Sequence, residues 1–197
     1  MVSTRNTRQD VVAAAGRLFA AKGYHGTSMR DLGKELGMLG GSLYAHVDSK
    51  QDLLVEVVEE GARLFEDSAA RASSTGGHAA SRLGAFVQGH VAVILDNLAV
   101  VRTYLNEAWA LDETRRSRVV AARDRYEAVL RSILSDGVDD GSFRPDLDPK
   151  IDAIFILSVL NAVERWYDPD GPIQGDALVD RILTFIGSGL SRRPRLS

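Results

Sequence analysis

Apolar residues recur along most of the chain with the three-to-four-residue spacing of helices that bury one face. In the first such segment Val11, Ala15 and Leu18 share one side, and Lys22-Gly23 supplies a basic last turn followed by a residue that ends helices readily. No segment shows the alternation of a half-buried strand convincingly. The pattern predicts helices over roughly 5–22, 28–36, 39–46, 49–72, 79–97, 99–111, 113–137, 149–167 and 175–190. We therefore predict an all-α fold of about nine helices.

Polar residues mark where several of these helices begin. Ser28 and Asp31, and again Ser49 and Asp52, have the spacing of a capping box, in which a hydroxyl and an acid three residues later satisfy free backbone groups. The small, polar run 72–77 is the clearest break in the chain. These signals support the helix boundaries that the apolar pattern predicts.

Two short helices near the N-terminus, 28–36 and 39–46, are separated by Gly37 and have the size of a helix-turn-helix. Gly37 permits the positive φ of a tight turn, and Gly33 is small where the helices cross. The same spacing also fits an ordinary helical hairpin. We predict a DNA-binding domain over residues 1–50 and a larger helical domain over residues 51–197.

The composition excludes disulfides and thiolate metal sites, and the charge is unevenly distributed along the chain. The 197 residues include no Cys, and neither a signal peptide nor an apolar run long enough to span a membrane is found, so we expect a cytoplasmic protein. The net charge is −3, yet residues 1–50 carry seven Lys or Arg against four Asp or Glu. A basic first quarter suits a polyanionic partner, although a difference this small also arises by chance.

Sequence patterns of catalysis are absent. The four His form no His-x-x-x-His pair, and there is no Gly-rich phosphate loop after a strand and no Gly-x-Ser-x-Gly. We therefore expect neither enzymatic activity nor a bound metal or cofactor. A purely structural helical adaptor would keep the apolar faces but would not need the polar residues of the 27–50 region.

The stretch TSMRDLGKELGMLGGSLYAHVDSKQDLL resembles the DNA-binding signature of the TetR family of transcriptional repressors. Thr27, Gly37, the run Gly41-Ser42-Leu43-Tyr44 and the pair Ser49-Lys50 stand at the matching positions. The resemblance implies a repressor that binds double-stranded operator DNA as a homodimer. The sequence departs from the family at two positions: Leu39 stands where a capping Ser or Thr is common, and Gly40 where Lys, Arg or Pro is common. We therefore expect a recognition helix that is frayed without DNA.

The resemblance also implies roles for individual residues. Thr27, Tyr44 and Lys50 would contact phosphates, and Gly41 would let the recognition helix approach DNA closely. A core position remains the alternative for Tyr44. Residues near base edges or adjacent phosphates would be Ser42, Ala45 and His46, with Arg30, Lys34, Arg5 and Arg8 in reserve.

The segment from about 94 to 182, with RWYDPDGP as its sharpest piece, is similar to a TetR subgroup that regulates fatty-acid, phenylacetate and steroid-ring degradation in response to acyl-CoA thioesters. A CoA ester needs an apolar channel and cationic or stacking groups at its mouth. The candidates are Arg102, Tyr104, Asn106, Trp109, Arg123, Arg165 and Trp166. Ion pairs with Glu107 or Glu164, or plain core packing, are the alternatives for several of them.

A second interpretation of the C-terminal domain is an efflux repressor that senses an uncharged hydrophobic compound. In either case the helices over 149–167 and 175–190 carry wide apolar faces, which predict a homodimer formed through the last two helices. We expect the effector to release the operator, with the helix that begins at Ser49 transmitting the change.

Overall fold

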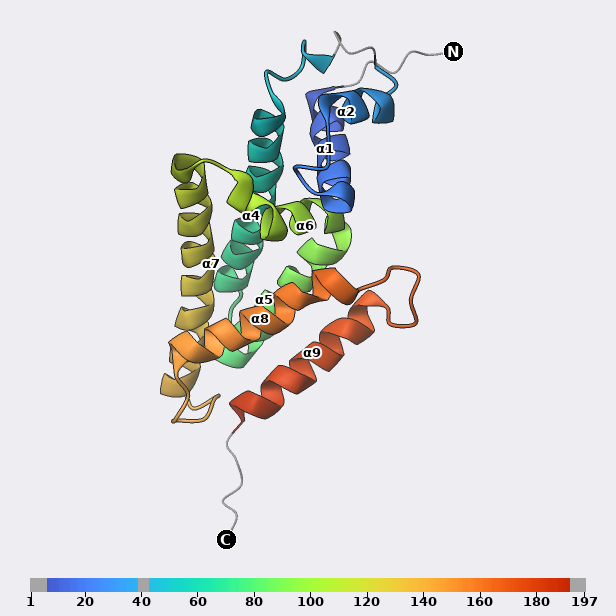
Figure 1. Cartoon of the computed structure of the whole chain (residues 1–197). Coiled ribbons are helices and arrows are strands. Elements are labelled where there is room, and N and C mark those ends of the chain that lie inside the picture. Colours follow the sequence, from blue (N-terminus) through green and yellow to red (C-terminus); the bar gives the residue numbers. More distant parts are fainter. Residues whose placement is uncertain (1–6, 39–42, 192–197) are drawn as a thin grey trace. The chain divides into compact units, whose positions relative to one another are not determined.

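The computed structural model describes residues 7–38 and 43–191 and is helical throughout (Figure 1). No strand occurs in this part of the chain, so the prediction of an all-α fold is confirmed. The helices are α1 (Arg8–Lys22), α2 (Met29–Glu35), α4 (Lys50–Ser74), α5 (Ala79–Asp96), α6 (Leu98–Asn106), the 3₁₀ helix η1 (Ala108–Ala110), α7 (Glu113–Asp139), α8 (Pro149–Trp166) and α9 (Gly175–Leu190).

Capping residues fix the starts of α2 and α4 where the sequence indicated, and the structure adds a cap at α8. Ser28 caps α2 in a complete capping box with Asp31, and hydrogen bonds from Ser28 hold the pKa of Asp31 below its usual value. At the start of α4 the Ser49 hydroxyl donates to the Asp52 carboxylate and accepts from the Asp52 backbone N–H. Asp148 caps α8, whose first residue is Pro149.

One predicted helix, 99–111, is interrupted. The α-helix ends at Asn106, and a short 3₁₀ turn follows. Glu107 is the C-cap of this helix, and its carboxylate accepts a hydrogen bond of 3.0 Å from the backbone N–H of Tyr24. Because this partner lies 83 residues earlier in the chain, helical periodicity could not predict the break.

The chain forms two compact units. Unit 1 comprises residues 1–63 and 97–121, and therefore contains α1, α2, α6, η1, residues 50–63 of α4 and the beginning of α7. In this unit α1 packs against α6, and Val11 and Ala14 of α1 and Val101 of α6 are fully buried. Gly61 of α4 lets Tyr104 of α6 approach closely, because a β-carbon at Gly61 would lie 2.6 Å from the Tyr104 Cβ.

Unit 2 comprises residues 64–96 and 122–197. Its central helix is α5, which packs against both α8 and α9. Arg144, in the loop before α8, donates from its backbone N–H to the Leu190 carbonyl at the end of α9 and pairs with Asp152 of α8. The largest fully buried side chains here include Phe86, Ile94, Leu130, Leu134 and Leu160.

Among the described residues, no single helix is long and apolar enough to span a membrane. Only α5 and α6 taken together, with the chain bent between them, reach that length and composition.

Candidate DNA-binding and effector sites

The helix-turn-helix region is built around α2 and a turn at Gly37, whose φ is 63°. The backbone N–H of Met38 donates to the Gly33 carbonyl over 2.8 Å and closes the turn. Leu43 and Val47, which follow the turn, are buried. The positive φ predicted for Gly37 is confirmed.

Two of the predicted DNA-binding side chains are exposed on this region. Tyr44 is 57% exposed, which excludes the alternative of a core aromatic residue in unit 1. Arg30 of α2 is exposed, and its side chain makes no hydrogen bond or ion pair with the described residues. A phenol and a guanidinium that point to solvent can both donate to phosphate oxygens.

Lys50 is held by the protein itself. Its ammonium donates to the backbone carbonyls of Tyr24 and Thr27, each over 2.9 Å, and lies 4.2 Å from the centre of the Tyr24 ring. An ammonium has three N–H donors, so one remains after these two contacts. Lys50 therefore first fixes the loop between α1 and α2 and has one donor left for another acceptor.

Thr27 is placed differently from what the resemblance implied. Its side chain is buried, with 2% of the residue exposed, and its hydroxyl donates towards the carbonyls of Gly23 at 2.9 Å and Leu18 at 3.2 Å. A hydroxyl has a single donor hydrogen, and phosphate oxygens are acceptors. The geometry thus assigns the Thr27 hydroxyl to the fold and does not support its predicted phosphate contact.

The rest of the predicted recognition helix is only partly described. Gly41 and Ser42, like the unusual Leu39 and Gly40, lie outside the described residues. His46 is half-buried, and its backbone carbonyl accepts a 2.7 Å hydrogen bond from Arg8 of α1.

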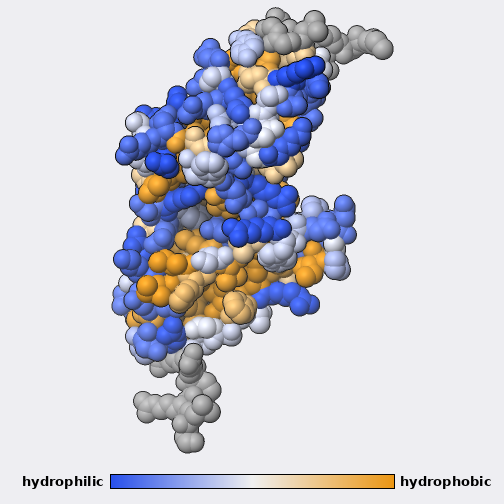
Figure 2. Space-filling view, in the orientation of Figure 1, coloured by the Kyte–Doolittle hydropathy of each residue, from blue (hydrophilic) through white to orange (hydrophobic). Residues whose placement is uncertain are grey.

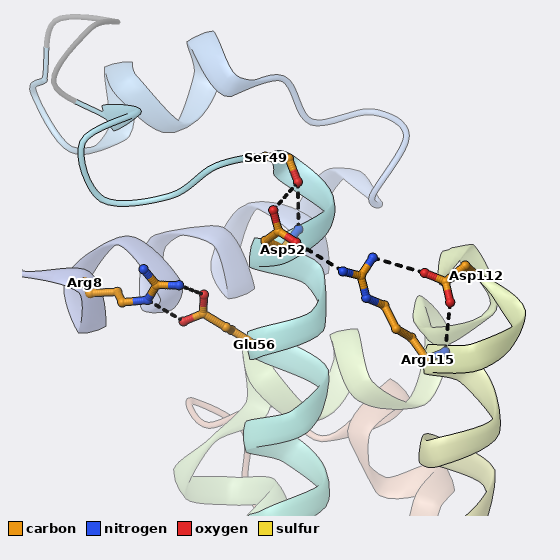
Figure 3. A network of polar contacts seen from close by, with 6 residues as sticks. All are labelled: Arg8, Ser49, Asp52, Glu56, Asp112 and Arg115. Carbon is orange, nitrogen blue, oxygen red and sulfur yellow. Dashed lines mark hydrogen bonds and ion pairs between the residues drawn. The ribbon is translucent and has the colours of Figure 1, made fainter.

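Two sets of polar contacts link α4 to its neighbours in unit 1 (Figure 3), and Arg8 of α1 belongs to one of them. Its guanidinium pairs with Glu56 of α4, and the hydrogen bonds that Arg8 donates to the Glu56 carboxylate raise the pKa of Arg8. On the same helix Asp52 lies 3.4 Å from Arg115 of α7, and Arg115 also pairs with Asp112, at 3.0 Å, before the start of that helix. Arg8, which the sequence suggested as a reserve DNA contact, is instead engaged within unit 1.

Four of the seven predicted effector residues lie in unit 1. Tyr104 is buried against Gly61. The Asn106 side chain donates to the Arg102 carbonyl one turn earlier in α6. Trp109 is 61% exposed, and its ring lies 5.3 Å from that of His25. Plain core packing, the alternative for Trp109, is thus excluded within unit 1.

The other three lie in unit 2. Arg123 of α7 is half-buried, whereas Arg165 and Trp166 are both exposed at the end of α8. Arg165 is 3.5 Å from the buried carboxylate of Glu164. Of the predicted effector residues in unit 2, Arg165 and Trp166 are therefore the two that are adjacent and exposed to solvent.

A buried cluster in unit 2 was not among the predicted sites. Phe65 of α4, Phe86 and His90 of α5, and Tyr126 of α7 form a group of rings with centroids 4.8–6.5 Å apart. His90 Nδ1 lies 2.9 Å from the Tyr126 hydroxyl, and burial lowers the pKa of His90 to about 3. The sequence did contain one sign of this cluster, because His90 follows Phe86 by four residues and therefore lies on the apolar face of α5.

An apolar face is exposed on unit 2. Phe155 of α8 and Phe185 of α9 are 64% and 66% exposed, and Ile151 and Ile154 add to the surface of α8. Figure 2 shows apolar side chains gathered over these two helices. Other apolar residues of the predicted interface, such as Leu160 and Ile182, lie in the core of the unit. We refer to Ile151, Ile154, Phe155 and Phe185 as the apolar face.

Comparison with known proteins identifies the class. Residues 11–57 match the model of bacterial regulatory proteins of the tetR family, and residues 76–190 match the tetracyclin repressor-like C-terminal domain. The chain belongs to the TetR family of transcriptional regulators.

Individual relatives narrow the comparison. The chain is 28% identical over 186 residues to the HTH-type transcriptional repressor KstR2 of Mycolicibacterium smegmatis, covering 94% of this chain and 91% of that protein. The structure of the ketosteroid transcriptional regulator KstR2 of Mycobacterium tuberculosis matches with a TM-score of 0.90 and 26% identity over 98% of both chains. AibR in complex with isovaleryl coenzyme A and operator DNA matches with a TM-score of 0.81 and 23% identity, over 90% of this chain and 96% of that one. This chain is thus a TetR-family transcriptional repressor similar to KstR2.

Proposed function

We propose that this repressor binds a palindromic operator as a homodimer and releases it when an acyl-CoA thioester binds. The observation that carries the DNA-binding part is the exposure of Tyr44 and Arg30 on a helix-turn-helix whose turns are held by internal contacts. In this interface Tyr44 and Arg30 contact phosphates, and the third donor of Lys50 adds a contact. Ser42, Ala45 and His46 are the residues proposed to lie nearest the base edges or adjacent phosphates.

Dimerisation rests on the apolar face of α8 and α9. One helix-turn-helix reads few base pairs, and a two-fold dimer doubles the contacts on a palindromic site. Side chains as exposed as Phe155 and Phe185 are costly in water unless a partner covers them. A second copy of the chain offers the same face and satisfies this need.

The effector assignment draws on the relatives and on the end of α8. AibR was solved with isovaleryl coenzyme A, and KstR2 is a ketosteroid transcriptional regulator, although the likeness to AibR supports the fold alone. In this chain Arg165 and Trp166 offer a cation and a stacking surface for the phosphates and adenine of a CoA group.

An uncharged hydrophobic effector is the second candidate. It is favoured by the interior of unit 2, where Phe65, Phe86 and Tyr126 surround a His90 that is neutral because it is buried. The two candidates differ at Arg165, which an uncharged compound does not need.

We expect the effect of effector binding to reach the DNA-binding region through the two helices that have residues in both units. The helices α4 and α7 each have residues in unit 1 and in unit 2, and within unit 1 the Asp52–Arg115 pair joins them. On the same helix as Asp52, Glu56 pairs with Arg8, and Arg8 donates a hydrogen bond to the backbone carbonyl of His46. An effector that binds one arrangement of these helices better lowers DNA affinity by its differential affinity, commonly about 1–3 kcal/mol.

The operator is tested by selecting DNA from a random-sequence library with the full chain. We expect enrichment of an inverted repeat with two half-sites. Failure to enrich any sequence would contradict a specific DNA-binding function.

Oligomeric state is tested by light scattering of the wild type and of Phe155→Glu. The wild type should be a dimer and the variant a monomer with operator affinity reduced at least about tenfold, because a buried charge disfavours the interface. Val120→Glu, at an exposed apolar position of α7, is the matched control and should stay dimeric. A dimeric Phe155→Glu variant would place the interface elsewhere.

The effector is tested by titrating the operator complex with long-chain acyl-CoA, an aromatic acyl-CoA and free CoA. At least one thioester should release DNA, and Arg165→Ala should weaken that response by about tenfold, the value of a charge-assisted contact. Lys150→Ala removes a charge from the same helix and should leave it unchanged. Release by an uncharged hydrophobic compound but by no thioester would favour the second candidate.

A further inference from the structure

Arg8 and Glu56 form an ion pair beside residues 43–46, the described end of the predicted recognition helix (Figure 3). The Arg8 guanidinium donates from Nε and from Nη2 to the two oxygens of the Glu56 carboxylate, and this bidentate pairing fixes its plane. Its Nη1 donates over 2.7 Å to the backbone carbonyl of His46. One side chain of α1 therefore binds α4 and the recognition segment at the same time.

The stability of the fold does not account for this pair. The Arg8 side chain is 58% exposed, and ion pairs that water surrounds contribute little to the free energy of unfolding. Leu43 and Val47 are buried and already attach the segment to unit 1. The hydrogen bond to the His46 carbonyl adds little to that attachment, but it restricts the orientation of the backbone between the two buried residues.

The surroundings of Arg8 do not favour a direct contact with a phosphate. Hydrogen bonds to Glu56 raise the pKa of Arg8 most, and the charges of nearby carboxylates raise it further. Those carboxylates are Glu56, Asp48 and Asp52. Several acids around one guanidinium offset its attraction for a polyanion. Glu56 by its charge alone disfavours DNA, so its place in the DNA-binding unit calls for another explanation.

The start of the predicted recognition helix lacks local support, which makes a contact at its end more important. Leu39 stands where a capping residue is common, and Gly40 lowers helix propensity. A cationic side chain that binds one of the last carbonyls of a helix stabilises that end. The contact between Arg8 and the His46 carbonyl has this form, and it comes from a residue 38 positions earlier in the chain.

We propose that Arg8, oriented by Glu56, is a positioning residue that fixes the recognition helix for DNA binding without contacting DNA itself. The inference rests on the proposed function, because it concerns the operator site of the same repressor. It assigns to Glu56, an acid, the role of strengthening the binding of a polyanion. An acid that acts only through its charge has the opposite effect.

The first experiment compares Glu56→Gln with Glu59→Gln in titrations of the full chain against its selected operator. Each variant removes one acid from α4, and Glu59 is an exposed position of that helix. Glu56→Gln should weaken binding about tenfold, because the operator complex must then order the segment itself. Glu59→Gln should bind as well as the wild type or better. Unchanged or tighter binding by Glu56→Gln, or equal weakening by both variants, would overturn the proposal.

A second experiment separates positioning from a phosphate contact of Arg8. Arg8→Lys keeps the charge, but an ammonium lacks the planar fork that holds both carboxylate oxygens and the His46 carbonyl. We expect this variant to bind as weakly as Glu56→Gln, and Arg8→Ala to keep the wild-type slope of log K against log salt. Wild-type affinity in Arg8→Lys, or a slope lower by about 0.9 for each lost contact in Arg8→Ala, would assign Arg8 to a phosphate and overturn positioning.

The contact itself is measured without DNA. In ¹³C-labelled protein the His46 carbonyl signal should shift in Arg8→Lys and in Glu56→Gln but not in Glu59→Gln, while the free energy of unfolding stays nearly that of the wild type. A His46 signal that neither variant moves would overturn the proposal.

The operator titrations also separate this proposal from the proposed function. If the wild type selects no operator, the proposed function fails and the role of the pair in DNA binding fails with it. If the wild type binds an operator and Glu56→Gln binds it equally well, the role of the pair alone is overturned.

Discussion

Unit 1 holds its turns with charged side chains, whereas the polar pair at the centre of unit 2 is neutral. In unit 1 Lys50 and Arg8 donate to backbone carbonyls around the helix-turn-helix, and Asp52 and Glu56 of α4 engage Arg115 and Arg8. In unit 2 His90 and Tyr126 are enclosed by aromatic rings. A surface that meets a polyanion gains from fixed cations, while a site for an apolar ligand is better lined by groups that stay uncharged.

The largest effect that we expect is the loss of stability caused by protonation of His90, which would end the neutrality of the pair in unit 2. Its pKa falls from 6.5 in the unfolded chain to about 3 in the fold, so between these values the unfolded state binds more protons. Stability is therefore retained above pH 6.5 and falls as the pH drops towards 3, by at most about 1.4 kcal/mol per pH unit. Chemical denaturation between pH 7 and pH 4.5 measures this slope, and His90→Leu should flatten it.

Asp140 provides the contrast for that experiment. Hydrogen bonds from Ser142 and from the backbone of Ala79 lower its pKa to about 2, so its contribution is lost only as the pH falls from 3.8 towards 2. A loss of stability above pH 4.5 that persists in His90→Leu would show that other groups cause it.

The next effect concerns packing in unit 1. Gly61→Ala would place a β-carbon 2.6 Å from the Tyr104 Cβ, an atom next to the backbone that cannot swing away. We expect a loss of about 1–3 kcal/mol in unfolding free energy. Gly84→Ala in α5 meets nothing within 4 Å and should stabilise by about 0.5–1 kcal/mol. Equal effects in urea titrations would refute the close contact.

A smaller effect is expected at Lys50, where a substitution tests whether this side chain stabilises the folded protein as well as contacting DNA. Lys50→Ala removes two charge-assisted hydrogen bonds to the loop before α2 and should cost about 1–2 kcal/mol of stability, together with operator affinity. Lys34→Ala, an exposed position of α2, should leave stability nearly unchanged. A Lys50→Ala variant with wild-type stability but weak DNA binding would instead favour a phosphate contact alone.

The smallest effect is expected for Arg30. Arg30→Ala should reduce the salt dependence of operator binding, lowering the slope of log K against log salt by about 0.9 for each lost phosphate contact. Unfolding free energy should not change, because the described structure gives this side chain no partner. Arg118→Ala on α7 is the matched control, and an identical slope in both variants would remove Arg30 from the interface.

Local signals in the sequence predicted much of this protein. The capping boxes at Ser28 and Ser49 and the turn at Gly37 depend on neighbours within a few residues, and the structure confirms them. The motif of residues 27–50 led to the TetR family, which the comparisons confirm.

Contacts between distant residues could not be foreseen. Thr27 and Lys50 have the residue types of phosphate contacts, yet their side chains bind carbonyls that only the folded loop presents. The predicted effector residues are divided between the two units, and the core spacing that contains His90 gave no sign that Nε2 would lack a partner.

The sequence by itself determined the helices, their caps and the family, because these depend on periodicity, short-range hydrogen bonds and a contiguous motif. Only the tertiary structure decided which polar groups remain free to bind something else. A donor is free or engaged according to the acceptors that folding brings beside it, and residues such as Glu107 and Tyr24 meet across 83 positions of the chain.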